Sequence, residues 1–107
     1  MNSELGFNLH PGATQDITEI WEFIADDSVQ AARRIRIEIF EAIESLVFLP
    51  HQGHKRIDLT TRPLRFRPVR EYLIAYAPDE KPLLVIAVIH GRRNPRTIAA
   101  ILNQRHY

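Results

Sequence analysis

The sequence predicts an α+β fold in which helices pack on a mostly antiparallel sheet, in the order β-α-α-β-β-β-α. Two adjacent segments of the first half repeat apolar residues at helical spacing, and a break of a few residues separates them. The second half carries short apolar runs typical of strands, followed by one more helical segment. A length of 107 residues predicts one domain over residues 1–107.

The first strand and the first helix come from a change of period. Residues 5–10 alternate apolar and polar side chains, which is typical of a strand with one buried face, and a Pro-Gly pair ends this run. Residues 13–25 then repeat apolar side chains at helical spacing. The opposite face of this helix carries polar residues, and we expect Asp16 and Glu19 there.

The second helix is predicted over residues 29–49, because its apolar residues again recur at helical spacing. Asp27 or Ser28 can cap its start by accepting free amide protons, and Pro50 ends it. The short break between two amphipathic helices predicts an antiparallel helical hairpin.

Strand patterns dominate the second half. Residues 55–59 form a possible short strand after a glycine-containing loop. Residues 64–76 alternate, and Pro68 among them marks an edge position or a bend between two strand pieces. The nearly unbroken apolar run 83–90 follows a short turn, so we expect it to pair antiparallel with the preceding strand and to lie centrally in the sheet.

The last element is predicted to be a helix that starts at an Asn-Pro pair. Asn94 can cap the helix with its side-chain oxygen, and Pro95 suits the first helical position. The pair therefore has a structural explanation and needs no functional one.

Composition excludes several classes of protein. The chain has no cysteine, so it has neither disulfides nor thiolate metal sites, and no apolar run approaches the roughly 20 residues that span a bilayer. The N-terminal residues lack the pattern of a signal peptide, so we expect a cytoplasmic protein without membrane contact. His51 and His54 lie in a loop with Asp58 as the nearest acid, which is too few ligands for a typical metal site. None of the serines lies in a motif typical of a catalytic nucleophile. We therefore expect no metal and no cofactor.

Charge is distributed unevenly along the chain. Residues 1–49 carry nine acidic and three basic side chains, a net charge of −6, whereas residues 50–107 carry four acidic and eleven basic ones, a net charge of +7. Either the second half faces an anionic partner, or the two halves neutralise each other across the fold; the two explanations are compatible.

Basic side chains are therefore the main functional candidates. Arginine binds phosphate and carboxylate bidentately, and His90 could exchange a proton near neutral pH or serve as a structural hydrogen-bonding group. The candidates, together with Tyr72 and His90, are Lys55, Arg56, Arg62, Arg65, Arg67, Arg70, Arg92, Arg93, Arg96 and Arg105.

Three stretches carry a family resemblance. They are "IWEFIADDSVQAARRIRIEIFEAIESLVFLPHQGHKRIDL", "LRFRPVREYLIAY" and "VIAVIHGRRN". Together they resemble the RelE/ParE superfamily of toxins from type II toxin-antitoxin pairs, and the resemblance covers residues 11–105. The resemblance implies the same α+β fold that the spacing of apolar residues predicts.

The superfamily implies two activities, and the residues discriminate between them. RelE-like members cut mRNA in the ribosome with a metal-free catalytic set of basic residues and a tyrosine. In this sequence Arg56 and Arg92 match that set, but Asp58 stands where a second lysine is expected, Leu73 replaces an arginine and Ile98 replaces the tyrosine. If the chain were such a ribonuclease, the resemblance and the residue types would leave as catalytic candidates Arg56, His90 and Arg92.

ParE-like members lack the catalytic set and poison DNA gyrase, and "RFRPVREYLIAY" and "HGRRN" resemble this branch more closely. The first hypothesis is thus a non-enzymatic gyrase inhibitor neutralised by a cognate, ParD-like antitoxin. The second is a nuclease acting on ribosome-bound mRNA, and the third is a degenerate toxin that only binds its antitoxin. We expect the antitoxin in an apolar groove between the helical hairpin and the sheet. Target or antitoxin binding is assigned to Arg65, Arg67, His90, Arg92, Arg93, Arg96 and Arg105.

Overall fold

The computed structural model describes residues 5–107 and has the predicted α+β fold; the first four residues of the predicted domain lie outside the described residues. The order of elements is β-α-α-β-β-β-α, as the sequence predicts. The elements are β1 (Phe7–Leu9), α1 (Pro11–Ala25), α2 (Val29–Phe48), β2 (Arg65–Val69), β3 (Tyr72–Ala77), β4 (Leu83–His90) and α3 (Pro95–Asn103). None of the helices in the described part of the chain is long and apolar enough to cross a membrane.

The sheet has the strand order β1-β4-β3-β2, so β4 lies inside the sheet as predicted. The β4–β3 and β3–β2 pairs are antiparallel, and only β1 runs parallel to β4. Pro68 lies on β2, an edge strand, where its missing N–H does least harm. The chain turns two residues later, because Val69 pairs with Tyr72 across a two-residue loop. Both predictions for Pro68, edge and nearby bend, are confirmed.

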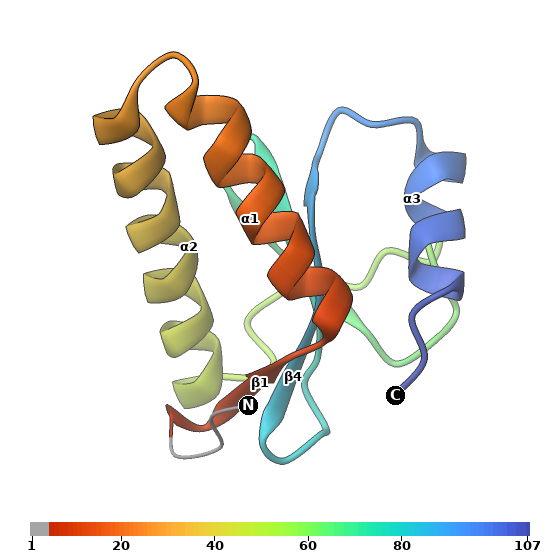
Figure 1. Cartoon of the computed structure of the whole chain (residues 1–107). Coiled ribbons are helices and arrows are strands. Elements are labelled where there is room, and N and C mark those ends of the chain that lie inside the picture. Colours follow the sequence, from red (N-terminus) through yellow and green to blue (C-terminus); the bar gives the residue numbers. More distant parts are fainter. Residues whose placement is uncertain (1–4) are drawn as a thin grey trace.

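Helices cover both faces of the sheet. The α1–α2 hairpin packs on one face, while α3 and the loop before β2 cover the other (Figure 1). The predicted starts of α2 and α3 are confirmed. The Ser28 hydroxyl caps α2 by accepting from the Ala31 amide, and the Asn94 side chain caps α3 by accepting from the Arg96 amide. The core under the hairpin includes Ala13, Ile17, Ile39, Ala42, Ile43, Leu46, Ile74, Tyr76, Val85 and Val88.

A β-bulge in β4 sets the direction of its last side chains. Tyr76 pairs with Val85 and Ala75 pairs with Ala87, so Ile86 has no partner of its own in the register. Beyond the bulge, side chains of β4 still alternate between the two faces of the sheet, but the alternation is shifted by one residue. Val88 therefore joins the core under the hairpin, and His90 emerges on the same face against Tyr72.

The short strand predicted over residues 55–59 is wrong. This segment forms a turn in which the amides of Leu59 and Thr60 both donate to the Arg56 carbonyl. The backbone of the loop before β2 pairs with the sheet through an isolated bridge between His54 and Phe66. The turn buries Leu59 against the face of the sheet that α3 covers.

Candidate functional site

Three arginines and a histidine gather where β4 ends and α3 begins. His90 is the last residue of β4, Arg92 and Arg93 lie in the following turn, and Arg96 lies in the first turn of α3. The three arginines are exposed and His90 is half-buried. We call these four residues the cationic rim.

The arginines of the rim are free of internal partners. Within residues 5–107, the side chains of Arg92, Arg93 and Arg96 form neither a hydrogen bond nor an ion pair. Their guanidinium groups therefore remain available to an external anion.

His90 is held in place more firmly than the arginines. Its Nδ1 accepts from the Arg92 amide at 3.1 Å, its Nε2 lies 3.5 Å from a carboxylate oxygen of Glu71, and its ring meets the Tyr72 ring edge-on at 5.4 Å between centroids. An accepting Nδ1 places the proton of the neutral ring on Nε2, facing that carboxylate. This arrangement orients the imidazole and accounts for its position without a catalytic role.

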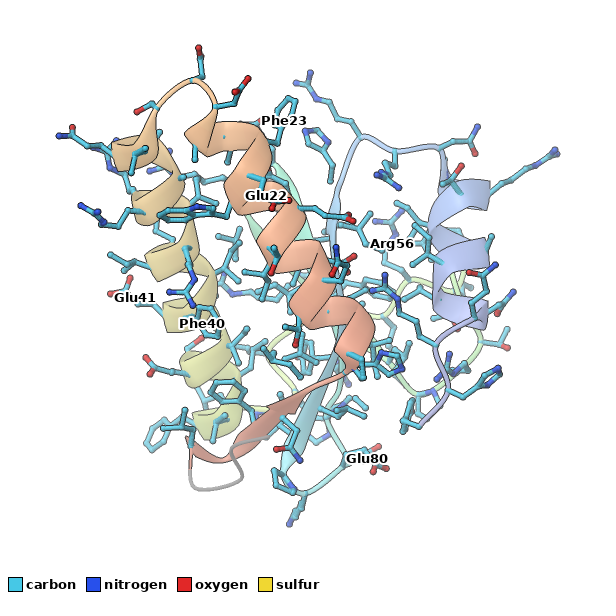
Figure 2. The ribbon with its side chains drawn as sticks, viewed as in Figure 1. Glu22, Phe23, Phe40, Glu41, Arg56 and Glu80 are labelled. Carbon is cyan, nitrogen blue, oxygen red and sulfur yellow. The ribbon has the colours of Figure 1, made fainter. Side chains whose placement is uncertain are left out.

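A groove of about 470 Å³ runs beside the rim, between α1 and α3 and over the end of the sheet. We call it the α1–α3 groove. Phe23, near the end of α1, stands at this end of the molecule with 80% of its surface exposed (Figure 2). The groove combines apolar and charged side chains, and it is lined by Asp16, Glu19, Ile20, Phe23, Tyr72, Val88, Ile89, His90, Arg93, Ile101 and Arg105.

The floor of the α1–α3 groove is the open edge of β4. Strand β1 pairs only with the first three residues of β4, so the later residues have no neighbouring strand on that side. Asp16 and Arg105 take its place: the Asp16 carboxylate accepts from the Val88 amide at 2.9 Å, and the Arg105 guanidinium donates to the Ile86 carbonyl at 3.1 Å. The two side chains also form a bidentate ion pair.

Three of the positions compared with the nuclease set, Arg56, Leu73 and Ile98, are unsuited to catalysis. Arg56 donates two hydrogen bonds to Asp58, at 2.9 and 2.7 Å, and this pairing lowers the pKa of the Asp58 carboxyl and raises that of Arg56. Leu73 offers no charge, and Ile98 is buried between α3 and the sheet. The described residues connect Arg56 to neither His90 nor Arg92 by any hydrogen bond or ion pair.

Comparison with known families identifies the chain. A family model described as the ParE toxin of type II toxin-antitoxin system, parDE, matches residues 7–95. The chain belongs to the ParE toxin family. It is therefore the toxin of a type II toxin-antitoxin pair, and membership implies a cognate antitoxin as its partner. Among curated proteins, no match to the chain was found.

Within this ParE-family toxin, the predicted binding residues separate into groups. Arg65 and Arg67 lie on β2, at the sheet edge two strands away from β4. Arg65 donates to the carbonyls of His51 and Gly53 and so holds the loop after α2, while Arg67 donates to the Pro68 carbonyl. The cationic rim brings together four of the predicted residues, and the α1–α3 groove is lined by two of these, His90 and Arg93, and by Arg105.

Arg105 of the toxin has an internal partner, which the sequence did not reveal. We expected Asp16 on the polar outer face of α1, yet its side chain is only 14% exposed and bound to Arg105, at 16% exposed. A Cβ at Gly12 would collide with this guanidinium, so a glycine in the first turn of α1 leaves room for it. The partners are 89 residues apart in the chain, so no local pattern could have indicated the pair.

Phe23 is the groove residue that the sequence reading left without a role. It lies outside the apolar stripe of the first helix, so helical spacing places it away from the core. An aromatic residue on the polar face of an amphipathic helix is the feature of the sequence that could have indicated a binding role for Phe23.

No metal site is found in the described part of the chain. Residues 5–107 hold no group of three or more His, Cys, Asp or Glu side chains placed to bind a metal ion.

Proposed function

We propose that this ParE-family toxin inhibits DNA gyrase without catalysing a reaction, and that its antitoxin neutralises it by binding the α1–α3 groove and the cationic rim. The supporting observation is that two positions of the nuclease set hold side chains unsuited to catalysis. Arg56 is paired with Asp58, and Ile98 is a buried core residue. Neither can stabilise a reacting phosphate or donate a proton to it in this arrangement.

The rim and the groove together suit a protein partner. The groove offers an exposed aromatic side chain, Phe23, beside the partly buried Ile20, and such residues serve as anchors in interfaces. Arg93 and His90 border the same groove, so a segment that carries both apolar and acidic residues would be complementary to it. The sequence predicts the antitoxin between the hairpin and the sheet, where core side chains fill most of the interface but a hollow of about 390 Å³ opens between α1, α2 and β1. We assign the antitoxin to the α1–α3 groove instead, because an exposed aromatic side chain and the cationic rim meet there.

Gyrase assays with purified toxin test the target. We expect inhibition of supercoiling and accumulation of cleaved DNA in the presence of gyrase, and no cleavage of mRNA on translating ribosomes. Unchanged gyrase activity together with mRNA cleavage would overturn the gyrase proposal in favour of a nuclease. If both assays were negative while the antitoxin still bound, the chain would be a toxin that retains only antitoxin binding.

A matched pair of phenylalanine variants tests the groove. Phe23→Ala should weaken antitoxin binding by about tenfold or more, because a truncated anchor residue typically costs over 1 kcal/mol. Phe48→Ala is the control: Phe48 is 85% exposed but lies at the end of α2, and the antiparallel hairpin places it away from the end of α1. Isothermal titration calorimetry with the antitoxin measures both. Equal affinities for the two variants would contradict docking in the α1–α3 groove.

A further inference from the structure

We infer that the cationic rim binds the phosphate backbone of duplex DNA directly, so that the toxin contacts the DNA as well as the protein in a gyrase–DNA complex. The inference rests on the proposed function, because a toxin that acts on gyrase meets its target on duplex DNA. It assigns a ligand class to Arg92, Arg93 and Arg96, whose side chains have no partner within residues 5–107.

The other arginines of the second half show why the rim differs. Arg56 and Arg70 each form a bidentate pair with a carboxylate, at 2.7 to 2.9 Å for Asp58 and 2.6 to 2.9 Å for Glu38. Their charges are already neutralised. The rim concentrates three exposed guanidinium groups within five positions of the chain, and phosphate is an anion that such groups bind bidentately.

The rim suits backbone contacts better than base recognition. The α3 N-terminus offers few free amides, because the Asn94 side chain already accepts from the Arg96 amide and the Asn94 carbonyl from the Thr97 amide. Contact therefore depends on side-chain charge. Tyr72, the aromatic ring that touches His90, is only 8% exposed and offers no face on which an unpaired base could stack; the exposed ring of Phe23 lies on α1, outside the rim. These features favour sequence-independent binding to a duplex.

One acidic side chain opposes binding. Glu71 is 69% exposed, and its carboxylate lies 3.5 Å from the His90 ring nitrogen at the border of the rim. Removing its charge should strengthen binding to an anion, while removing arginines should weaken it. This opposite pair of effects is expected of an electrostatic surface and not of a general loss of folding.

The test measures binding of the purified toxin, without gyrase, to a fluorescein-labelled 20-base-pair duplex by anisotropy over a range of salt concentrations. If three phosphates are contacted, the slope of log K against log salt should be about −2.7, since each contact contributes about −0.9. Arg92→Ala/Arg93→Ala should reduce the steepness by about 1.8. Glu71→Gln should bind about twofold to fivefold more tightly at low salt.

Lys55→Ala/Lys81→Ala is the charge-matched control, because both residues are exposed and lie in the loop before β2 and in the turn before β4, outside the rim. It should bind nearly as the unaltered toxin does. Equal losses in both double variants, no binding of duplex, or tighter binding of single-stranded RNA of the same length would each overturn the inference. A toxin that fails to bind DNA but still traps gyrase on cleaved DNA would overturn this inference alone, whereas DNA binding without any effect on gyrase would overturn the proposed target.

Discussion

Tyr76 is buried completely, yet its hydroxyl makes two hydrogen bonds that hold the loop after α2. The hydroxyl donates to the Pro50 carbonyl at 2.7 Å and accepts from the Gly53 amide at 3.0 Å. A Cβ on Gly53 would lie 2.6 Å from this hydroxyl, so the close approach requires glycine. One side chain on β3 thus determines where the chain runs between the hairpin and β2.

Tyr76→Phe should lower the free energy of unfolding by about 1 to 3 kcal/mol, because the Gly53 amide and the Pro50 carbonyl lose a buried partner. Tyr72→Phe is the matched control on the same strand: its hydroxyl forms no hydrogen bond within residues 5–107, so its change should stay near zero. Urea unfolding followed by circular dichroism measures both. Equal effects for the two variants would contradict the role given to the Tyr76 hydroxyl.

The same residue gives a dependence on alkaline pH. Burial raises the pKa of the Tyr76 hydroxyl above its ordinary value of about 10, despite hydrogen bonding from Gly53 that acts the other way. The unfolded chain then ionises first as pH rises, so stability is fully present below about pH 10 and declines above it. Unfolding measured from about pH 9 to about pH 11 should show a smaller decline in Tyr76→Phe than in the unaltered chain. Identical declines would contradict this assignment.

At the scale of elements, β4 is completed by two side chains in place of a strand. Because β1 is short, the amide of Val88 and the carbonyl of Ile86 face away from any neighbouring strand. Asp16 on α1 and Arg105 after α3 bind these groups and each other. The ion pair therefore joins the hairpin, the sheet and the C-terminal segment at the edge where the α1–α3 groove opens.

Asp16→Ala should destabilise the fold by about 2 to 4 kcal/mol, because it leaves Arg105 mostly buried without its counter-ion and the Val88 amide without its acceptor. Glu19→Ala, one turn further along the same helix and exposed, should change stability by less than about 0.5 kcal/mol. Thermal unfolding of both variants provides the comparison. Similar melting temperatures would show that the pair contributes little.

At the scale of the whole molecule, one of the two explanations for the charge asymmetry is observed directly: charges of the two halves neutralise each other. Glu38 binds Arg70 and Asp16 binds Arg105, so two ion pairs neutralise charge between the acidic first half and the basic second half. The rim arginines take no part in this exchange within residues 5–107. Three of the positive charges that remain unpaired therefore lie together at one end of the sheet, next to the α1–α3 groove.

An Arg92→Ala/Arg93→Ala/Arg96→Ala variant should fold with nearly unchanged stability, because these side chains form no hydrogen bond or ion pair within residues 5–107. It should lose most of its toxicity on induction in growing cells, and at low salt it should associate with the antitoxin more slowly than the unaltered toxin does. Growth curves, induction of the response to DNA breaks and binding kinetics measure these outcomes. A variant that stayed fully toxic and fully antitoxin-bound would show that the rim has neither role.

By itself, the sequence determined the order of the elements, the cap at Asn94, the two alternatives Asp27 and Ser28 for the cap of α2, and the central place of β4. These depend on local periods and on capping groups within a few residues, which a single chain displays directly. Tertiary structure decided the rest. The bulge at Ile86 sets the face on which His90 emerges. The pairing of Arg105 with Asp16 and of Arg56 with Asp58 occupies two of the candidate arginines, while the side chains of the rim arginines keep no partner within residues 5–107. Which charges remain free depends on contacts between residues distant in the chain, and those exist only once the chain has folded.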